Sequence, residues 1–459
     1  MRNRLTLYAA AAGMVFLAGC TMGPNYKRPA INAPATYRSD PAPPAADIPS
    51  LGDEKWWQVF KDEELQKLVR QAIENNYDVR IAASRILEAQ AQVGITRADQ
   101  LPSLSASAGV NSLKFPVFSY TIMQVQGAFS WTPDFWGRYR RATEAARAQL
   151  LGSEWNRKQV IGTLVADVAT AYFTLRELDL ELEISRRTLT SRQESLKLTQ
   201  TLESGGAAAL VDVRQAEQLV ETAAGAIPDL ERQIAQAENL LSTLMGDNPH
   251  DVTRGLPLDR QPLPESVPAG LPSRLLARRP DIQAAEQQLV AANAQIGVAR
   301  AAFFPELSLT GSGGVQSNVL GNLFSADSGA WSFSPVITQP IFQGGRLKSN
   351  LRLAEATRQE MIDRYKQTIQ QAFREVSDAL IAYQKDREFT DHQRALTAAA
   401  ADAARLSDLR YRGGAASYLE VLSSETNHYS AQLTLARAQL SQRVSLVQFY
   451  SALGGGWEQ

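Results

Sequence analysis

The sequence predicts a mixed α+β membrane protein built from two internal repeats, each with two β-strands and long α-helices. Three observations predict this fold class. Phrases of the first half recur in the second half, four segments of about ten residues alternate between apolar and polar side chains, and two long runs have the composition of uninterrupted helices. Each helical run, at 1.5 Å per residue, would be roughly 100 Å long and would need neighbouring helices along its length.

The repeats are visible in quoted stretches. "AQVGITRADQLPSLSASAG" begins at Ala91 and matches "AQIGVARAAFFPELSLTGSG", which begins at Ala294. "SGGAAALVDV" begins at Ser204 and matches "RGGAASYLEV", which begins at Arg412. The offset grows from 203 to 208 residues, which is far longer than a solenoid unit and indicates duplication of a whole half-domain. The predicted domains are a first repeat (61–246), a Pro- and Gly-rich linker or equatorial segment (247–279), and a second repeat with a C-terminal equatorial tail (280–459).

Both repeats have the same predicted order of elements. A helix comes first, two strands follow, a very long helix comes next, and a last helix starts after two glycines. The predicted ranges are 61–99, 103–113, 120–132, 138–203 and 208–245 in the first repeat, and 280–302, 306–317, 330–341, 344–411 and 416–452 in the second.

The N-terminus has the features of a lipoprotein signal peptide. Residues 1–19 contain two arginines and then a short apolar run, which fits a secretory signal and is too short for a permanent membrane helix. The run ends in "LAGC", and Cys20 is the only cysteine of the chain. We therefore expect a covalent lipid on Cys20. Thr21 follows instead of Asp, which predicts the outer membrane of a Gram-negative cell. Residues 20–60 are predicted to form a lipidated, extended N-terminal arm.

The four predicted strands have one apolar and one polar face. The apolar positions are Leu104, Ala106, Ala108 and Val110, then Met123, Val125, Phe129 and Trp131, then Leu307, Leu309 and Val315, and finally Trp331, Phe333 and Ile337. The other face carries Ser, Thr, Gln and Asn, which suits a wet lumen. Taken alone, this alternation favours an ordinary half-buried sheet of a soluble domain. In a membrane, four strands would leave open edges in lipid, so several copies would have to close one wall.

Several phrases resemble one known family. These are "MGPNYKRP", "WWQVFKDEELQKLVRQAIENNYDVR", "LPSRLLARRPDIQAAEQQL", "FFPELSLTG", "PIFQGGR" and "LGGGW". They resemble the outer membrane factors of tripartite efflux pumps, and more narrowly the OprM/NodT-like lipoprotein branch with its TolC-like fold. The resemblance covers nearly all of the mature chain.

The resemblance implies a homotrimer in which each chain gives four strands to a 12-stranded barrel and its helices to a 12-helix periplasmic tunnel. It implies two partners, a periplasmic adaptor and an inner-membrane transporter, usually a proton-driven one. The channel is expected to be a passive export duct for drugs or other small toxic compounds, opened at its periplasmic tip. It is expected in the outer membrane, both lipid-anchored and spanning, with a periplasmic helical extension.

The paired glycines mark the predicted functional site. Glycine ends a helix cheaply in the left-handed conformation, so each pair predicts a helical hairpin turn. The sequence from Ser417 to Glu420 fits a capping box that starts the last helix, whereas the first repeat has Ala209 at the position of Ser417. By resemblance, these turns dock the adaptor. The candidate docking residues are Gly205, Gly206, Ala207, Val211, Gly413, Gly414, Ser417, Tyr418 and Leu419.

A gate is expected beside the second turn, also by resemblance. Asp408, Tyr411 and Arg412 lie within one turn of the glycines. Asp408 and Arg412 are four residues apart, so they fit a local ion pair along one helix, worth a few tenths of a kcal/mol. The alternative is that Arg412 or Tyr411 bonds to another helix while Asp408 lines the constriction. Because only the second turn carries Arg412, Tyr418 and the capping box from Ser417 to Glu420, gating is expected to depend more on the second turn than on the first.

The sequence contains no recognisable catalytic or metal-binding motif. The three histidines are scattered, and there is no P-loop, nucleophile elbow or zinc-protease motif. A net charge of -1 argues against nucleic acid as a partner. We therefore expect no enzyme activity, no metal, and no cofactor beyond the lipid on Cys20. The alternative function is a lipid-anchored periplasmic coiled-coil adaptor or spacer with no pore. The cargo, the cognate partners and the open or closed state are left open.

Overall fold

The computed structural model describes residues 21–38, 50–264 and 267–458. The predicted signal peptide and the predicted lipid-attachment residue Cys20 therefore lie outside the described residues. The chain divides into two compact units. Unit 1 consists of Met1–Ile31, Ser84–Trp155 and Ala284–Gln367, and unit 2 consists of Asn32–Ala83, Asn156–Gln283 and Thr368–Gln459.

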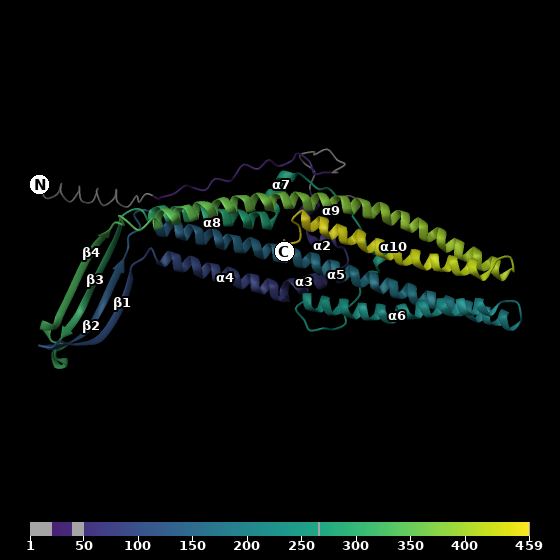
Figure 1. Ribbon diagram of the computed structural model, residues 1–459, viewed down its shortest axis with the longest axis horizontal. Helices are drawn as coiled ribbons and strands as arrows, with labels where there is room; N and C mark the ends of the chain where they lie inside the picture. Colours follow the sequence, from purple (N-terminus) through teal and green to yellow (C-terminus); the bar gives the residue numbers. More distant parts are fainter. Residues whose placement is uncertain (1–20, 39–49, 265–266, 459) are drawn as a thin grey trace. The chain divides into compact units, whose positions relative to one another are not determined.

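Unit 1 contains a four-stranded antiparallel sheet (Figure 1). Its strands are β1 (Ser103–Lys114), β2 (Ser119–Trp131), β3 (Glu306–Ser317) and β4 (Gly329–Thr338), which lie side by side in this order. Each repeat supplies one hairpin, and β2 pairs with β3 to join the two hairpins. The strand predictions are confirmed to within a few residues at every end.

The pairing register keeps the two faces of the sheet separate. Leu104 lies opposite Phe129, which lies opposite Gly311, and Gly311 lies opposite Phe333. The neighbouring row consists of Ser103, Ser130, Thr310 and Ser334. Because strand side chains alternate between faces, the first row belongs to an apolar face and the second to a polar face. No residue of β1 or β4 is buried, so neither face of these strands is covered within the chain.

Close strand packing explains one glycine of the "GSGG" stretch. A side chain at Gly314 would place its Cβ only 2.1 Å from the carbonyl oxygen of Val125 on β2. Gly314 is therefore required by the approach of two backbones, as is common for glycine inside strands.

Two long helices begin in unit 1 and end in unit 2. They are α5 (Arg138–Ser204) and α9 (Arg346–Arg412), each of 67 residues. In unit 2, α6 (Leu210–Leu244) runs back along the end of α5, and α10 (Tyr418–Ala452) runs back along the end of α9 (Figure 1). The predicted long helices and hairpins are confirmed. No helix in the described part of the chain has the length and apolar character needed to cross a membrane.

The predicted single helix over 61–99 is wrong, because the structure has α3 (Glu63–Asn75) and α4 (Tyr77–Ala98) instead. Asn76 separates them. Its side-chain oxygen accepts hydrogen bonds from the backbone N–H groups of Asp78 (2.8 Å) and Val79 (3.3 Å), and its amide donates to the carbonyl of Leu244 (2.9 Å). Asn76 thus caps the start of α4 and binds the end of α6.

Short helices also interrupt the segments predicted as irregular. The described part of the N-terminal arm contains η1 (Leu51–Asp53) and α2 (Trp56–Val59). The linker contains η2 (Leu258–Arg260) and α7 (Pro272–Arg278), and α8 (Pro280–Ala301) follows it.

Candidate functional site

The two helix turns have the same backbone geometry. Gly206 and Gly414 adopt φ of +75° and +72°, the left-handed conformation. The N–H of Ala207 donates to the carbonyl of Leu202 (2.8 Å), and the N–H of Ala415 donates to the carbonyl of Arg410 (2.8 Å). This closing bond is typical of a Schellman motif. The predicted glycine turns are therefore present in both repeats.

The predicted capping box at the second turn is wrong. Ser417 makes no side-chain cap hydrogen bond. Glu420 instead accepts from the guanidinium of Arg410 across the turn (2.6 Å), which draws its carboxylate away from the helix start. The first turn, which was predicted to be less well specified, has half of a box, because Asp212 accepts the N–H of Ala209 (3.2 Å).

Tyr418 is buried rather than available for docking. It is only 2% exposed, and its ring lies 5.4 Å from that of Tyr411 in an edge-on arrangement. Both rings pack with Ala216 and Val421, so one cluster joins α9, α10 and α6. The prediction that Tyr418 contacts a partner is therefore wrong, since its side chain belongs to the core of the turn.

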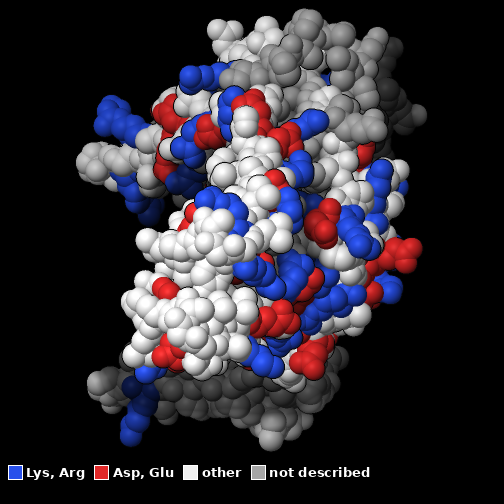
Figure 2. All heavy atoms as spheres, turned by 90° about the vertical axis from the view of Figure 1, so that its right-hand side faces the viewer, with Lys and Arg blue, Asp and Glu red and all other residues white. Residues whose placement is uncertain are grey.

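The other candidate docking residues are exposed. Val211 and Leu419, which occupy equivalent positions of the two repeats, are 58% and 60% exposed. The remaining exposed candidates are Gly205, Gly206, Ala207, Gly413, Gly414 and Ser417. Figure 2, which views the chain from the side of the turns, shows Lys and Arg interspersed with Asp and Glu and uncharged surface between them. A partner approaching this face meets apolar side chains and charges of both signs.

Of the gate candidates, Arg412 and Asp408 contact each other along α9, whereas Tyr411 packs against residues of α10 and α6. Arg412 donates to Asp408 through its Nε (2.8 Å), an exposed i,i+4 ion pair. Burial raises the pKa of Tyr411, which packs against Tyr418. Arg410, which the sequence reasoning missed, is the arginine that connects α9 with α10 through Glu420. Neither its type nor its spacing distinguished it from Arg412.

Two further charged residues, Arg192 and Glu425, interact near the gate candidates. Arg192 of α5 is 2% exposed, donates to the carbonyl of Leu219 (2.8 Å) and lies 5.0 Å above the ring of Tyr429. Burial raises the pKa of Glu425 on α10. The positive charge of Arg192 partly opposes this shift, and the negative charge of Asp408 adds to it. Sequence reasoning missed this group because its members are far apart in the chain.

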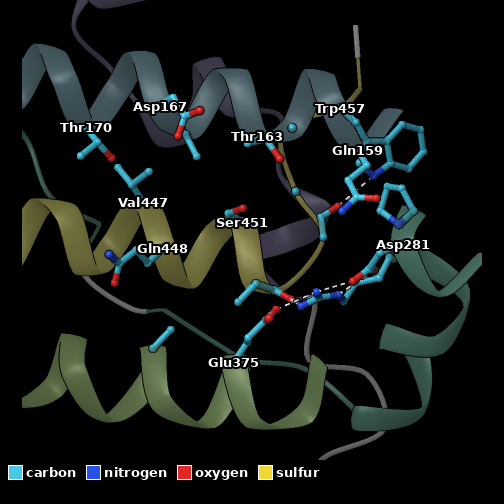
Figure 3. A pocket seen from close by; sticks show the side chains of 18 of the residues that line it. Gln159, Thr163, Asp167, Thr170, Asp281, Glu375, Val447, Gln448, Ser451 and Trp457 are labelled. Atoms are coloured by element: carbon cyan, nitrogen blue, oxygen red, sulfur yellow. Dashed lines mark hydrogen bonds and ion pairs between the residues drawn. The ribbon is translucent and has the colours of Figure 1, made fainter. Parts of the chain in front are cut away.

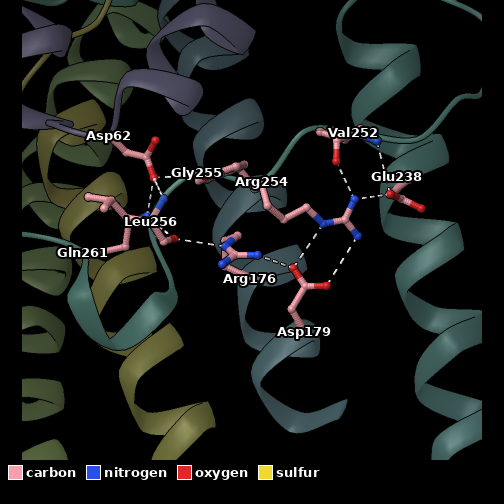
Figure 4. Close-up of polar contacts among 10 residues, drawn as sticks. Asp62, Arg176, Asp179, Glu238, Val252, Arg254, Gly255, Leu256 and Gln261 are labelled. Carbon is pink, nitrogen blue, oxygen red and sulfur yellow. Dashed lines mark hydrogen bonds and ion pairs between the residues drawn. The ribbon is translucent and has the colours of Figure 1, made fainter. Parts of the chain in front are cut away.

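The linker is fixed by a polar network in unit 2 (Figure 4). Asp62 is 1% exposed and accepts hydrogen bonds from the Tyr172 hydroxyl (3.0 Å) and the N–H of Leu256 (2.9 Å). It also accepts from Gln261 and from two N–H groups at the start of α3. Burial alone would raise the pKa of Asp62, but these hydrogen bonds hold it below its usual value.

Arginines complete this network. Arg254 pairs with Glu238 of α6 and with Asp179 of α5, whose carboxylate also accepts from Arg176 (2.5 Å). The linker is therefore bound to both helices of the first hairpin.

The second arginine of the "RRPD" phrase, Arg279, connects the start of α8, the middle of α9 and the end of α10. Arg279 donates to Asp281 (2.6 Å), to Glu375 of α9 (2.7 Å) and to the carbonyl of Ala452 at the end of α10 (3.0 Å). These residues lie beside a cavity of about 730 Å³ bordered by α5, α9 and α10 (Figure 3). A cation near the last carbonyls of a helix stabilises its C-terminus. Among the residues described, no group of three or more His, Cys, Asp or Glu is arranged to hold a metal ion.

Known proteins resemble the chain over almost its whole length. Residues 68–247 and 271–455 match the model of the family described as outer membrane efflux protein. The chain is 39% identical over 469 residues to the probable efflux pump outer membrane protein TtgC of Pseudomonas putida, covering 98% of this chain and 96% of that relative. It is 35% identical over 448 residues to the cation efflux system protein CusC of Escherichia coli, covering 96% and 97%.

Solved structures give the same result. The open state of the MtrE outer membrane channel of Neisseria gonorrhoeae matches with a TM-score of 0.87 and 36% identity, over 96% of this chain and 99% of that one. The CmeC outer membrane channel of Campylobacter jejuni matches with a TM-score of 0.88 and 26% identity, over 96% of both chains.

The fold is that of outer membrane efflux channels. The chain belongs to the outer membrane efflux protein family, which confirms the predicted fold class, location and general function. The alternative of a pore-free adaptor or spacer is set aside, because the similar structures are outer membrane channels.

Proposed function

We propose that three copies of the chain form the outer membrane duct of a tripartite, RND-type efflux pump. Each copy contributes four strands to a 12-stranded barrel and its helices to a 12-helix periplasmic tunnel. A lipid on Cys20 anchors each copy to the same membrane. Drugs or other small toxic compounds pass through this duct from the periplasm to the exterior.

The sheet of unit 1 carries the proposal. Leu104, Trp331 and Ile337 are 81%, 84% and 72% exposed, although they belong to the apolar face. β1 and β4 are the outer strands of the sheet, so each has one edge without a partner in the chain. Exposed apolar side chains and open edges are both satisfied when copies join edge to edge within a lipid bilayer.

The duct is passive and has no catalytic role in this proposal. The family's relatives include pump components named for toluene, antibiotics and cations. Since proteins of similar sequence are named for such different compounds, selectivity is assigned to the transporter and not to the duct.

In detergent, the purified, lipidated mature protein should have three times the mass of a single chain. In gel electrophoresis, the unheated sample should migrate faster than the heated one. In a planar bilayer it should conduct ions. A monomeric mass together with no conductance would contradict the proposal.

The exposed turns are assigned to the periplasmic adaptor. Replacing Val211 and Leu419 by Glu places charges in an apolar contact, so we expect at least a tenfold loss of adaptor affinity, or about 1.4 kcal/mol. Leu240→Glu is the matched control, because Leu240 is 53% exposed on α6 but distant in sequence from the turn. Binding is measured with the purified channel and its periplasmic adaptor. Equal affinity of the double variant and the control would exclude the turns as the docking site.

A further inference from the structure

Two buried carboxyl groups lie together on α5, outside the turns. Glu177 and Glu181 are one helical turn apart, and each is only 5% exposed. Carboxylates are seldom buried to this extent unless each has a partner of opposite charge. Here the two carboxyls act on each other, because Glu181 raises the pKa of Glu177.

One arginine binds Glu181, and its charge also acts on Glu177. Arg437 of α10 donates through Nε to one oxygen of Glu181 (2.8 Å) and through Nη2 to the other (3.5 Å). The side chain of Arg437 is 66% exposed, so it covers Glu181 on the side that faces solvent. Since α5 belongs to the first repeat and α10 to the second, this contact lies on the seam between the repeats.

Other charged groups on the neighbouring elements bind partners of their own. Asp179 of α5 binds Arg176 of the same helix and Arg254 of the linker. On α6, Glu238 binds Arg254. On α9, Asp386 accepts a hydrogen bond from Ser441.

The neighbouring tyrosine of α10 is engaged as well, because the hydroxyl of Tyr429 bonds that of Ser185 (2.9 Å). Among the residues that the structure describes, Arg437 is therefore the one cation that acts on the two acidic groups.

We propose that Glu177 and Glu181 form a proton-sharing carboxyl pair, fastened by Arg437, that couples the packing of α5 on α10 to pH. Glu181 is the charged member and binds Arg437. Glu177 keeps its proton and donates it to Glu181. A proton is thus a structural ligand of this seam, and its release leaves two buried anions beside one guanidinium.

Electrostatics agree with this assignment. Burial, followed by the charge of Glu181 and the hydrogen bond to it, raises the pKa of Glu177 to about 8, and Arg437 only partly opposes the shift. A carboxyl beside a second carboxyl commonly behaves in this way, because both cannot ionise at close range.

The direction of the pH effect follows from the raised pKa. Glu177 in an opened, hydrated seam has the ordinary value of 4.5, whereas in the packed seam it is about 8. The packed state therefore holds one more proton between these two values. Its extra stability is fully present below pH 4.5 and is lost as the pH rises to about 8. The seam is tightest in an acidic periplasm.

Hydrogen exchange of the backbone amides around residues 177–185 tests the proposal in the purified full-length channel. After correction for the intrinsic pH dependence of exchange, the opening constant of the wild type should rise about tenfold per pH unit between pH 5 and 8, because opening releases one proton. In Glu177→Gln the amide replaces the shared proton, so the opening constant should not change with pH. Glu183→Gln is the matched control, since Glu183 is exposed on the same helix, and it should behave like the wild type.

An infrared titration provides a readout that does not depend on stability. The wild type should show the carbonyl stretch of a protonated carboxyl, with a component that disappears with a midpoint near pH 8, and Glu177→Gln should lack this component. A wild-type channel without this component, or exchange profiles that run parallel in the wild type and Glu177→Gln, would overturn the proposal.

Discussion

At the scale of single residues, Asp62 illustrates how one buried carboxylate fixes several segments. We predict that Asp62→Asn destabilises unit 2 by about 2 kcal/mol at pH 7, because a neutral amide cannot accept all five hydrogen bonds and leaves buried donors unpaired. The measurement is chemical denaturation monitored at several pH values.

The pH dependence of this variant has a definite sign. The pKa of Asp62 lies below its ordinary value of 3.8, so the stability it contributes is present above pH 3.8 and is lost as the pH falls further. The difference between the wild type and Asp62→Asn should therefore shrink in strong acid. Glu63→Gln, an exposed neighbour at the start of the same helix, is the control and should cost less than about 0.5 kcal/mol.

The gate residues make a second residue-scale prediction. Replacing Tyr411 and Arg412 by Ala together removes the ring contact with Tyr418 and the ion pair with Asp408. We expect a higher single-channel conductance in a planar bilayer, because the tip is less constrained. Arg405→Ala, which breaks a comparable exposed pair with Asp402, should leave conductance unchanged. Unchanged conductance in the double variant would exclude Tyr411 and Arg412 from the gate.

Which residues of a turn face inward was only partly predictable from sequence. Tyr418 and Leu419 are adjacent and both large, yet the first is buried and the second is exposed. Glu181 and Arg437 are 256 residues apart, so motif reasoning, which finds residues close together in the chain, missed their contact. Arg410 and Glu420 are only 10 residues apart, but nothing in the sequence distinguished Arg410 from Arg412.

At the scale of elements, the glycine turns allow a matched comparison within one hairpin. Gly206 has φ of +75°, so Gly206→Ala forces a side chain into the left-handed region at a cost of about 1 kcal/mol. This cost does not come from a steric clash, since nothing lies within 4 Å of the added Cβ. We expect faster hydrogen exchange at the end of α5.

The neighbouring glycine is the control for this prediction. Gly205 has no positive φ, and an added Cβ would make only ordinary contacts, the nearest at 3.5 Å from the carbonyl of Thr201. Gly205→Ala should therefore be close to neutral. Equal exchange in the two variants would mean that the left-handed conformation is not what closes this turn.

Element boundaries were predictable where a strong local signal ends them. Both long helices stop at a glycine pair, and both strands of each hairpin follow a clear alternation, so their ends were predicted within a few residues. The break at Asn76 was missed although its cap bonds to the N–H groups of Asp78 and Val79 are local. The bond from Asn76 to the carbonyl of Leu244, which only the fold brings near, could not be predicted from sequence. The capping box at Ser417 failed for the related reason that Arg410 competes for Glu420.

At the scale of the whole molecule, the sheet explains why this chain requires further copies of itself. Its two faces differ in chemistry, its two outer edges are unpaired, and its apolar side chains are exposed. Sequence periodicity alone established the two faces. The number of copies depends on the curvature and the stagger of the closed wall, which a four-stranded pattern does not contain, so three copies came from the family resemblance.

The two faces lead to a final prediction with adjacent residues of β4. Phe333 is on the apolar face and Ser334 is on the polar face, since they are neighbours along one strand. Phe333→Arg places a charge in lipid at a cost of about 2–4 kcal/mol per copy near the middle of the bilayer, so we expect less assembled channel in the outer-membrane fraction. Ser334→Arg places the same charge in the wet lumen, so this variant should assemble normally and shift the ion selectivity of the pore toward anions. Normal assembly of Phe333→Arg, or failure of Ser334→Arg alone, would reverse the assignment of the two faces.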